Sequence, residues 1–226
     1  MPISKHEGRD AKRLTNGFGD TWPCCSAVFH LGWWQRILVS GREYMDVDAL
    51  IAFLIANGRK WISDQRELHN PHSAPLSQKE IGIFQRFFCE ETIKRVRVRH
   101  VPRIENPLFY ADLARAGVPI PFDFRKMAGI TFDDTILTSD LYVHAQPRIS
   151  LLFHEMVHVV QYGLLGVSEF TKQYVQGWVQ NRFVYAEIPL ECDAYKLQQC
   201  FERTPQFAFS VEEIVETRLG KAHRAT

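Results

Sequence analysis

The sequence lacks two features that would assign the chain to a common class: paired cysteines and a strong net charge. None of its five cysteines stands in a CxxC pair (Cys24, Cys25, Cys89, Cys192 and Cys200). This spacing argues against a thiolate zinc ribbon and a disulfide framework, so we expect buried free thiols in a reducing compartment. The 27 Lys and Arg residues nearly balance the 26 Asp and Glu residues, so no overall field attracts nucleic acid or an anionic membrane.

Long uncharged apolar runs are also missing. A membrane-spanning helix needs about 20 nearly uncharged apolar residues, whereas the apolar stretch WPCCSAVFHLGWWQRILVS contains His30, Gln35 and Arg36. The same stretch does not have the form of a secretory leader. We therefore expect a chain that is made in the cytoplasm and has no membrane partner, with any export left to a dedicated secretion system.

Length and composition favour one folded core. A chain of 226 residues with 12% aromatic residues suits a single domain of ordinary size and argues against disorder. We expect three regions along it: a flexible tail at residues 1–20, an N-terminal helical segment at 21–70 that packs on the main domain, and the main domain at 75–210.

The N-terminal segment contains one clear helical pattern, MDVDALIAFLIANGRKW. Asp46 or Asp48 can cap its start, and Asn57 followed by Gly58 provides a stop signal. A cluster of Pro, Ser, Asn and His at residues 67–77 marks a soft boundary after it.

The first half of the main domain predicts a helix and then strands. Ser77 and Glu80 have the spacing of a capping box, and apolar residues continue at helical spacing to residue 93. RVRVRHV alternates with a period of two, which predicts a strand with Val96 and Val98 on one face. Its arginines suit a solvated sheet edge better than a nucleic-acid stripe. AGITFDDTILTSDLYV predicts one or two further short strands.

The second half is predicted to be helical. Pro147 opens a helix that Gly163 or Gly166 closes, and SEFTKQYVQGWVQNRF and PLECDAYKLQQCFERT follow as helices. The last of these has a core-facing stripe, formed by Leu190, Ala194, Leu197 and Phe201. The predicted fold class is α+β, mostly helical, with a small sheet that precedes the helix opened by Pro147.

Two histidines and a glutamate stand inside the apolar run LLFHEMVHVVQY, residues 151–162. Positions i and i+4 share one helix face, so His154 and His158 point the same way, while Glu155 lies about 100° round the axis. Two neutral imidazoles one turn apart can bind a single zinc ion, and the adjacent carboxylate can act as a general base on a water there. Burial of three ionisable groups without compensation would be costly, so we favour a zinc hydrolase site over incidental histidines.

A third zinc ligand has to come from further along the chain, because catalytic zinc sites usually have three protein ligands. The longer pattern HExxHxxGxxH does not continue here, since Gln161 and Leu164 occupy its glycine and histidine positions. The acidic candidates are Glu169, Glu187, Glu191 and Asp193.

Glu191 is our choice among these four. It lies in the first turn of a helix begun by Pro189, and the small Ala194 three positions on allows two helices to approach closely. The alternative for Glu191 is an ordinary interaction with the helix dipole. Glu187 is the second choice as ligand, and Asp193 is a candidate partner that orients a ligand imidazole.

Several of these segments together resemble a known family. The predicted helix 77–93, the RVRV strand, AGITFDDTILTS, LLFHEMVHVVQY and IPLECDAY resemble the HExxH metallopeptidase-like domain at the core of extracellular contractile injection systems. HVVQY is the most specific piece and the ExxA pattern at Glu191 is weaker, while Tyr162 departs from the glutamine often found there. The resemblance covers about residues 75–203 and leaves the N-terminal 70 residues outside it.

The resemblance implies a zincin-like fold with a gluzincin-type zinc site, in which His154, His158 and Glu191 are the metal ligands and Glu155 is the general base. The function that it implies is hydrolysis of peptide bonds in a peptide or protein substrate. Such a reaction also needs a donor for the tetrahedral oxyanion. The open candidates for that donor are Tyr174, Tyr185, Tyr195 and His144.

Two other functions remain as alternatives. One is a zinc-binding, non-catalytic module, such as cargo or a component of a phage-like secretion particle; an intact Glu155 argues against it, because zinc binding alone does not require that carboxylate. The other is a small-molecule metallohydrolase, which would use the same residues in a closed cavity. An open groove beside an exposed strand would favour peptides instead, and ITFDDTILTS could hold an extended peptide at its edge.

Overall fold

The computed structural model describes residues 36–39, 43–118, 122–141 and 148–222. The predicted tail at 1–20, residues 21–35, His144 and Pro147 lie outside the described residues. Trp33–Thr226 clusters as one compact unit, so the stretch at 67–77 falls inside this unit.

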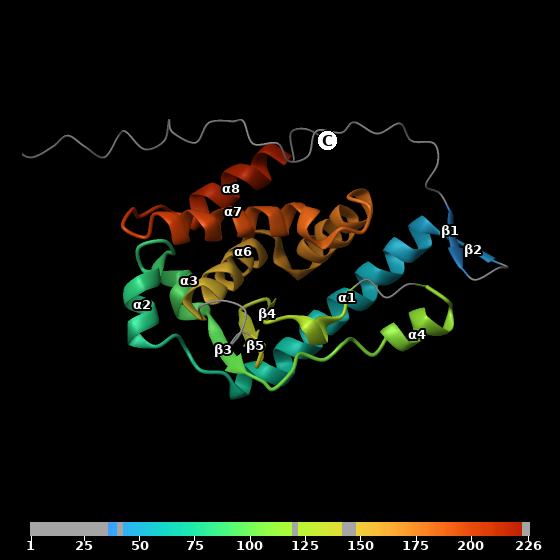
Figure 1. Cartoon of the computed structure of the whole chain (residues 1–226), viewed down its shortest axis with the longest axis horizontal. Coiled ribbons are helices and arrows are strands. Elements are labelled where there is room, and N and C mark those ends of the chain that lie inside the picture. Colours follow the sequence, from blue (N-terminus) through green and yellow to red (C-terminus); the bar gives the residue numbers. More distant parts are fainter. Residues whose placement is uncertain (1–35, 40–42, 119–121, 142–147, 223–226) are drawn as a thin grey trace, which may run out of the picture. The chain divides into compact units, whose positions relative to one another are not determined.

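The described residues form two small sheets and many helices (Figure 1). In chain order the elements are β1 (Arg36–Val39), β2 (Glu43–Asp46), α1 (Val47–His69), η1 (Asn70–His72), α2 (Gln78–Phe84), α3 (Glu90–Arg95), β3 (Arg97–His100), α4 (Tyr110–Arg115), η2 (Phe124–Lys126), β4 (Gly129–Phe132), β5 (Thr135–Thr138), α6 (Arg148–Gln180), η3 (Tyr185–Glu187), α7 (Pro189–Arg203) and α8 (Val211–Ala222). This order confirms the α+β class, mostly helical with a small sheet before the helix of the HExxH motif.

The sheet before α6 has three strands in the order β3-β5-β4. Strand β5 is central, parallel to β3 and antiparallel to β4. Val96 and Val98 are buried, and β3 is an edge strand, as the RVRV pattern predicts. The segment after residue 128 forms two strands, joined by a tight turn in which Asp133 has a φ of 57°. Strands β1 and β2 form a separate antiparallel pair.

Helix α1 is longer than the sequence pattern predicts. Asp46 caps it by accepting a hydrogen bond from the Asp48 N–H, but the expected stop at Asn57 and Gly58 is wrong. The Asn57 amide donates back to the carbonyl of Phe53 within the helix. A Cβ atom on Gly58 would lie 3.1 Å from the Thr171 methyl group on α6. The glycine therefore serves a close approach of two helices and does not end the first one.

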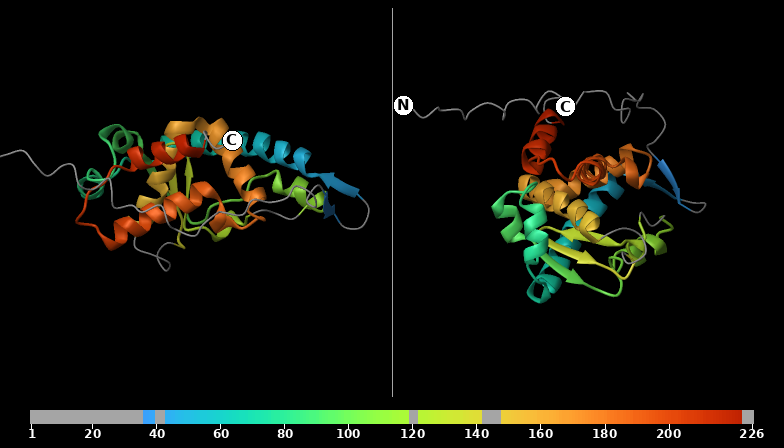
Figure 2. Two further views of the ribbon diagram at one scale, coloured as in Figure 1. Left: turned by 90° about the horizontal axis from the view of Figure 1, so that it is seen from above. Right: turned by 60° about the vertical axis from the view of Figure 1, so that its left-hand side comes forward.

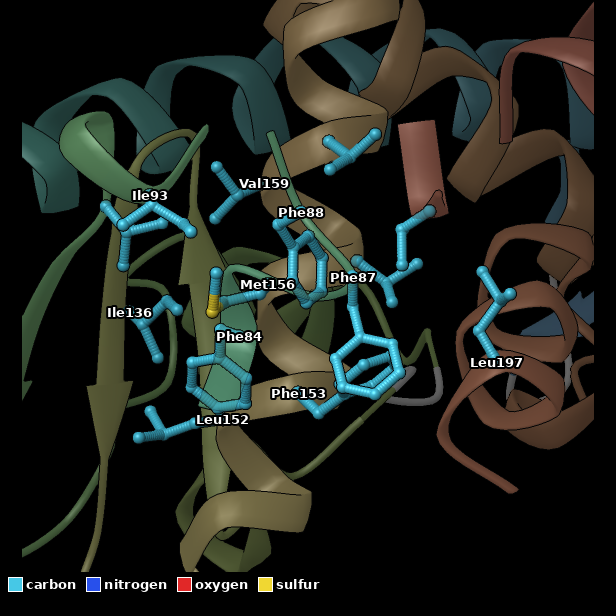
Figure 3. Close-up of a cluster of buried hydrophobic side chains, with 14 of the residues drawn as sticks. Phe84, Phe87, Phe88, Ile93, Ile136, Leu152, Phe153, Met156, Val159 and Leu197 are labelled. Carbon is cyan, nitrogen blue, oxygen red and sulfur yellow. The ribbon is translucent and has the colours of Figure 1, made fainter. Parts of the chain in front are cut away.

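The predicted single helix at 77–93 is wrong: two short helices, α2 and α3, stand in its place. The capping box of Ser77 and Glu80 is confirmed at the start of α2. The N–H of Cys89, the residue just before α3, donates to the Glu212 carboxylate of α8 at 2.9 Å, which holds the start of α3 from a distant part of the chain. The break does not disturb the core, because Phe84 and Phe88 both pack against Phe153 of α6 (Figure 3).

Helix α6 is the central element. It contacts α1, α7, α8 and the strands β4 and β5, and it lies between the three-stranded sheet and α8 in Figure 1 and in the right-hand view of Figure 2. Of the two predicted ends, Gly163 lies inside the helix, whereas Gly166 has φ 70° and ψ 161° and breaks it. A second helical stretch then continues to Gln180, which confirms the helix expected at SEFTKQYVQGWVQNRF.

Helix α7 packs on α6 through the predicted stripe, since Leu190, Ala194, Leu197 and Phe201 are all buried. Cys89, Cys192 and Cys200 are free thiols, but the expected burial is wrong: Cys89 is exposed and the other two are half-buried. Within the described ranges, no helix is both long enough and apolar enough to cross a membrane.

Candidate metal centre

The structure brings three of the predicted site residues together. His154 and His158 lie one turn apart on the buried face of α6, and their Nε2 atoms are 3.2 Å apart. From the first turn of α7, the Oε2 atom of Glu191 lies 3.3 Å from Nε2 of His154 and 3.5 Å from Nε2 of His158. These residues are 5%, 5% and 2% exposed, so the cluster is almost fully buried.

Small residues allow α7 to reach this position beside α6. Ala194 is fully buried, as expected for a residue that permits close helix packing. Gly177 on α6 faces the first residue of α7, because a Cβ atom there would lie 2.7 Å from Cδ of Pro189. Glu191 follows two residues later, and its carboxylate thereby meets the two imidazoles.

Two glutamines determine which nitrogen of each imidazole faces the cluster. Nδ1 of His154 lies 3.0 Å from Oε1 of Gln198, and Nδ1 of His158 lies 2.8 Å from Oε1 of Gln161. Each amide is oriented by its own nitrogen: that of Gln161 donates to the Leu190 carbonyl and that of Gln198 to the Ser150 hydroxyl. Both amide oxygens therefore accept, so in the neutral form of each imidazole Nδ1 carries the proton and Nε2 presents a lone pair.

Three electron-pair donors then converge without a hydrogen-bond donor between them. Oε2 of Glu191 is buried and has no hydrogen-bond partner in the described part of the chain. Buried groups of this kind are nearly always satisfied, so a cation is the natural complement. The group His154, His158 and Glu191 can bind a metal ion. Its donor separations of 3.2, 3.3 and 3.5 Å match the roughly 3.3–3.6 Å edges of a tetrahedron with zinc–ligand bonds of about 2.0–2.2 Å.

The other oxygen of Glu191 is held by two tyrosines. The hydroxyl groups of Tyr174 and Tyr185 each donate to Oε1 of Glu191 at 2.7 Å. Burial, together with the charge of Glu191, raises the pKa of both hydroxyls well above the ordinary tyrosine value. Both stay protonated as donors, which orients the carboxylate and leaves Oε2 for the histidines.

Electrostatics within the cluster favour an ionised carboxylate. Burial alone would raise the pKa of Glu191, but His158 and His154 more than offset that effect and lower it well below the ordinary value. Burial likewise lowers the pKa of His158, and the Glu191 carboxylate reverses this and raises it to about 9. The site therefore attracts positive charge, which a metal ion or a proton can supply.

Glu155 lies beside the cluster and is held from the sheet. Thr131 of β4 donates its hydroxyl to Oε2 of Glu155 at 2.7 Å. A Cβ atom on Gly129 would lie only 2.6 Å from Oε1 of Glu155, so a larger residue there would displace this carboxylate. Burial raises the pKa of Glu155, although His154, His158 and the Thr131 hydroxyl oppose the shift. A carboxyl group with a raised pKa can exchange protons nearer to neutral pH.

A cavity of about 130 Å³ opens beside these groups. Glu155, His158 and Glu191 line one part of it, and mostly aromatic and aliphatic side chains from α1, α6, β4 and the segment around η2 line the rest. The candidate base and two candidate ligands therefore share one concave space, which is the usual setting of an enzyme site.

Tyr195 is the remaining described candidate for oxyanion stabilisation. Its ring lies over His154, with ring centroids 4.5 Å apart, and the residue is 40% exposed. Burial and the charges of Glu191 and Glu155 raise the pKa of Tyr195 to about 12. Tyr174 and Tyr185 are already engaged with Glu191, and His144 lies outside the described residues.

The other acidic candidates do not reach the cluster. Glu187 is exposed on η3, and Glu169 bonds to Lys172 and Gln173. Asp193 does not orient an imidazole, because it pairs with Arg218 of α8 at 2.7 Å. Gln161 and Gln198 take that role instead, and the sequence analysis did not identify them. Gln161 follows His158 by three residues and Gln198 follows Glu191 by seven, so each lies on the same helix face as a candidate ligand.

Comparison of the chain with protein-family models, with curated proteins and with solved structures found no match.

Proposed function

We propose that this chain is a zinc-dependent metalloendopeptidase with a zincin-like, gluzincin-type site. One observation carries the proposal: Glu155 is a buried carboxylate, fixed by Thr131, that shares a cavity with His158 and Glu191. A site that only stores or binds a metal does not require a carboxylate in that place. Two imidazoles and one carboxylate are a common donor set for catalytic zinc, and this is why we propose zinc as the metal.

Glu155 is proposed to move the proton in the reaction. When bound, zinc supplies Lewis acidity, which polarises a carbonyl group and lowers the pKa of a water molecule. The Glu155 carboxylate accepts a proton from the attacking water as the oxygen–carbon bond forms. It then transfers that proton to the amine nitrogen as the carbon–nitrogen bond breaks, so the base returns to its ionised form.

The edge of the sheet supports a peptide as substrate. Strand β4 is an edge strand of its sheet, and its residues Gly129 and Thr131 adjoin Glu155. The Ser139 N–H donates to the Ala128 carbonyl, so these two residues form a hydrogen-bonded pair of the β4–β5 ladder. Along an antiparallel ladder, hydrogen-bonded pairs alternate with pairs whose backbone groups face outward. The backbone groups of Gly129 and Thr131 therefore point away from β5, where an extended peptide can add as a further strand.

Tyr195 is proposed to stabilise the oxyanion that forms during attack. It lies four residues after Glu191 on α7, hence on the same helix face, and its ring contacts His154. Within the described part of the chain its hydroxyl makes no hydrogen bond to another side chain, whereas those of Tyr174 and Tyr185 both donate to Glu191. A hydroxyl proton directed at the developing charge would lower the barrier.

Peptide cleavage by the zinc-loaded protein tests the proposal. Unfolded casein is incubated with wild type and with Glu155→Gln, and new peptide ends are quantified by mass spectrometry. We expect Glu155→Gln to keep its zinc but to cleave about 10²–10⁴-fold more slowly, the usual contribution of a general base. Equal rates for the two zinc-loaded proteins would overturn the peptidase proposal and favour a non-catalytic zinc module.

A further inference from the structure

Helix α1 forms part of the wall of the cavity that contains Glu155. Leu54, Gly58, Trp61 and Ile62 all line it, although they lie in the N-terminal part of the chain that the family resemblance does not cover. Gly58 is positioned against Thr171 of α6, where a Cβ atom would come within 3.1 Å of the threonine methyl group. The cavity thus depends on a helix that lies outside the segments in which the resemblance was found.

Away from the candidate metal centre the walls of the cavity are mostly aromatic and carry no charge. Trp61 lies edge-on to Phe132, with ring centroids 5.0 Å apart, and 4.7 Å from the ring of Phe124. From the other side Phe122 packs on Trp178 at 5.0 Å. Among the described residues, no Lys, Arg or Asp lines the cavity. The Glu and His side chains that line it are Glu155, His158 and Glu191, all at the candidate metal centre.

The volume of the cavity suits one ring. An apolar cavity of about 150 Å³ is large enough to bind benzene, and the present one measures about 130 Å³. Aromatic walls favour edge-to-face and offset contacts with a further ring. A charged side chain would lose its hydration there without gaining a partner on the uncharged walls.

We propose that this cavity is a specificity pocket for an aromatic side chain of the substrate, at a residue that flanks the scissile bond. This inference rests on the proposed peptidase function, because the pocket begins at Glu155, where bond cleavage would occur. Helix α1 then acts as a specificity element: it closes one wall of the pocket and selects substrates by ring size and lack of charge.

Binding of p-cresol, the side-chain analogue of tyrosine, tests the pocket without any need for activity. The zinc-loaded full chain is titrated with p-cresol and with 4-hydroxybenzoate, which has the same ring but carries a carboxylate. Tryptophan fluorescence reports binding, since Trp61 and Trp178 line the cavity. We expect p-cresol to bind at least 10-fold more tightly than 4-hydroxybenzoate; no binding of p-cresol, or equal binding of both, would overturn the proposal.

A cavity-filling variant locates the bound ring. Val175 of α6 lines the cavity, whereas Val179, one turn later on the same helix and equally half-buried, does not. Val175→Phe is expected to weaken p-cresol binding at least 10-fold, and Val179→Phe to leave it unchanged. Equal affinity in both variants would place the ring elsewhere. Should Val175→Phe fail to fold, Ile130→Phe fills the same cavity from β4.

A peptide library separates this inference from the proposed function. Zinc-loaded wild type is expected to cleave peptides with Phe or Tyr at one position beside the scissile bond at least 10-fold faster than those with Asp, Lys or Ala there. Cleavage without that preference would overturn the specificity pocket and leave the peptidase intact. Absence of any cleavage would overturn the peptidase, and p-cresol binding would then decide on the pocket alone.

Discussion

The side-chain oxygen Oε1 of Gln198 lies 3.0 Å from Nδ1 of His154, so the other imidazole nitrogen of His154 faces Glu191. The amide nitrogen of Gln198 donates to Ser150, which prevents the amide from turning over. A residue outside the candidate metal site thereby sets the tautomer of His154, one of its candidate ligands. Such partners commonly contribute a substantial part of metal affinity.

Gln198→Leu should therefore weaken zinc binding about 10–100-fold, because it leaves a buried N–H on His154 without an acceptor. Zinc affinity is measured by competition with a chelator of known strength. Gln199→Leu is the matched control, since Gln199 is the exposed neighbour on the same helix. The proposed role of Gln198 fails if both variants bind zinc as tightly as wild type.

Gly129→Ala should destabilise the fold by about 1–3 kcal/mol, the usual cost of overpacking. The new methyl group would lie 2.6 Å from Oε1 of Glu155 and 3.0 Å from Cδ1 of Leu151, so these buried side chains have to shift within a packed environment. Urea unfolding measures the change. On α2, Gly82 has no atom within 4 Å of a Cβ position, and Gly82→Ala should stabilise by about 0.5–1 kcal/mol. A neutral effect at Gly129 would contradict the tight contact.

Tyr195→Phe should lower kcat for peptide cleavage about 10²-fold, the lower end of the range for loss of one oxyanion donor. KM and zinc content should stay close to wild type, because the hydroxyl is proposed to act only as negative charge develops. Steady-state kinetics with a fluorogenic peptide separate the two constants. Tyr185→Phe provides the contrast: its hydroxyl holds Glu191, so zinc affinity should fall. An unchanged kcat in Tyr195→Phe would remove it from the mechanism.

Asp134, which lies outside the candidate metal centre, should make the free energy of unfolding sensitive to acid. Burial raises the pKa of Asp134, but the hydrogen bonds and charge of Arg66 more than offset this and lower it below the ordinary value. A lowered folded-state pKa adds stability above the ordinary carboxyl pKa and loses it as the pH falls through the folded-state value. Asp134→Asn should thus cost about 1.5–3 kcal/mol at pH 7 and clearly less at pH 3.

Urea unfolding of wild type and Asp134→Asn at both pH values measures this difference. Asp64→Asn is the control, because the Lys60–Asp64 pair on α1 is exposed and should contribute less than about 1 kcal/mol. A loss in Asp134→Asn that is equally large at pH 3 and pH 7 would show that the ionised carboxylate is not what stabilises the turn.

Local spacing was sufficient to predict which residues meet in the candidate metal centre. The i and i+4 positions of His154 and His158 place them on one helix face, and the small Ala194 correctly indicated that Glu191 lies on a closely packed helix. The orienting partners were not predicted, because Asp193 and Gln198 both lie on α7 and only the tertiary structure shows which one faces His154.

The errors in the fold have the same cause. Gly58 carries a stop signal in sequence, but its actual role is a contact with Thr171, a residue more than a hundred positions later. The break between α2 and α3 is stabilised by Glu212 of α8, and the spacing of the phenylalanines fits one helix or two equally well. Sequence patterns indicate where helices and strands form and which of their faces are buried. The residues that end or extend a helix through tertiary contacts come from elsewhere in the chain.

The zinc content of purified wild type, Glu191→Ala and Glu187→Ala tests the central claim most directly. After incubation with zinc and removal of the excess, elemental analysis should find one zinc ion per chain in wild type and in Glu187→Ala. Glu191→Ala should lose most of it, because Oε2 of Glu191 is the third donor beside the two Nε2 atoms. Zinc retained in full by Glu191→Ala, or a wild type that stays free of metal, would contradict the site described by His154, His158 and Glu191.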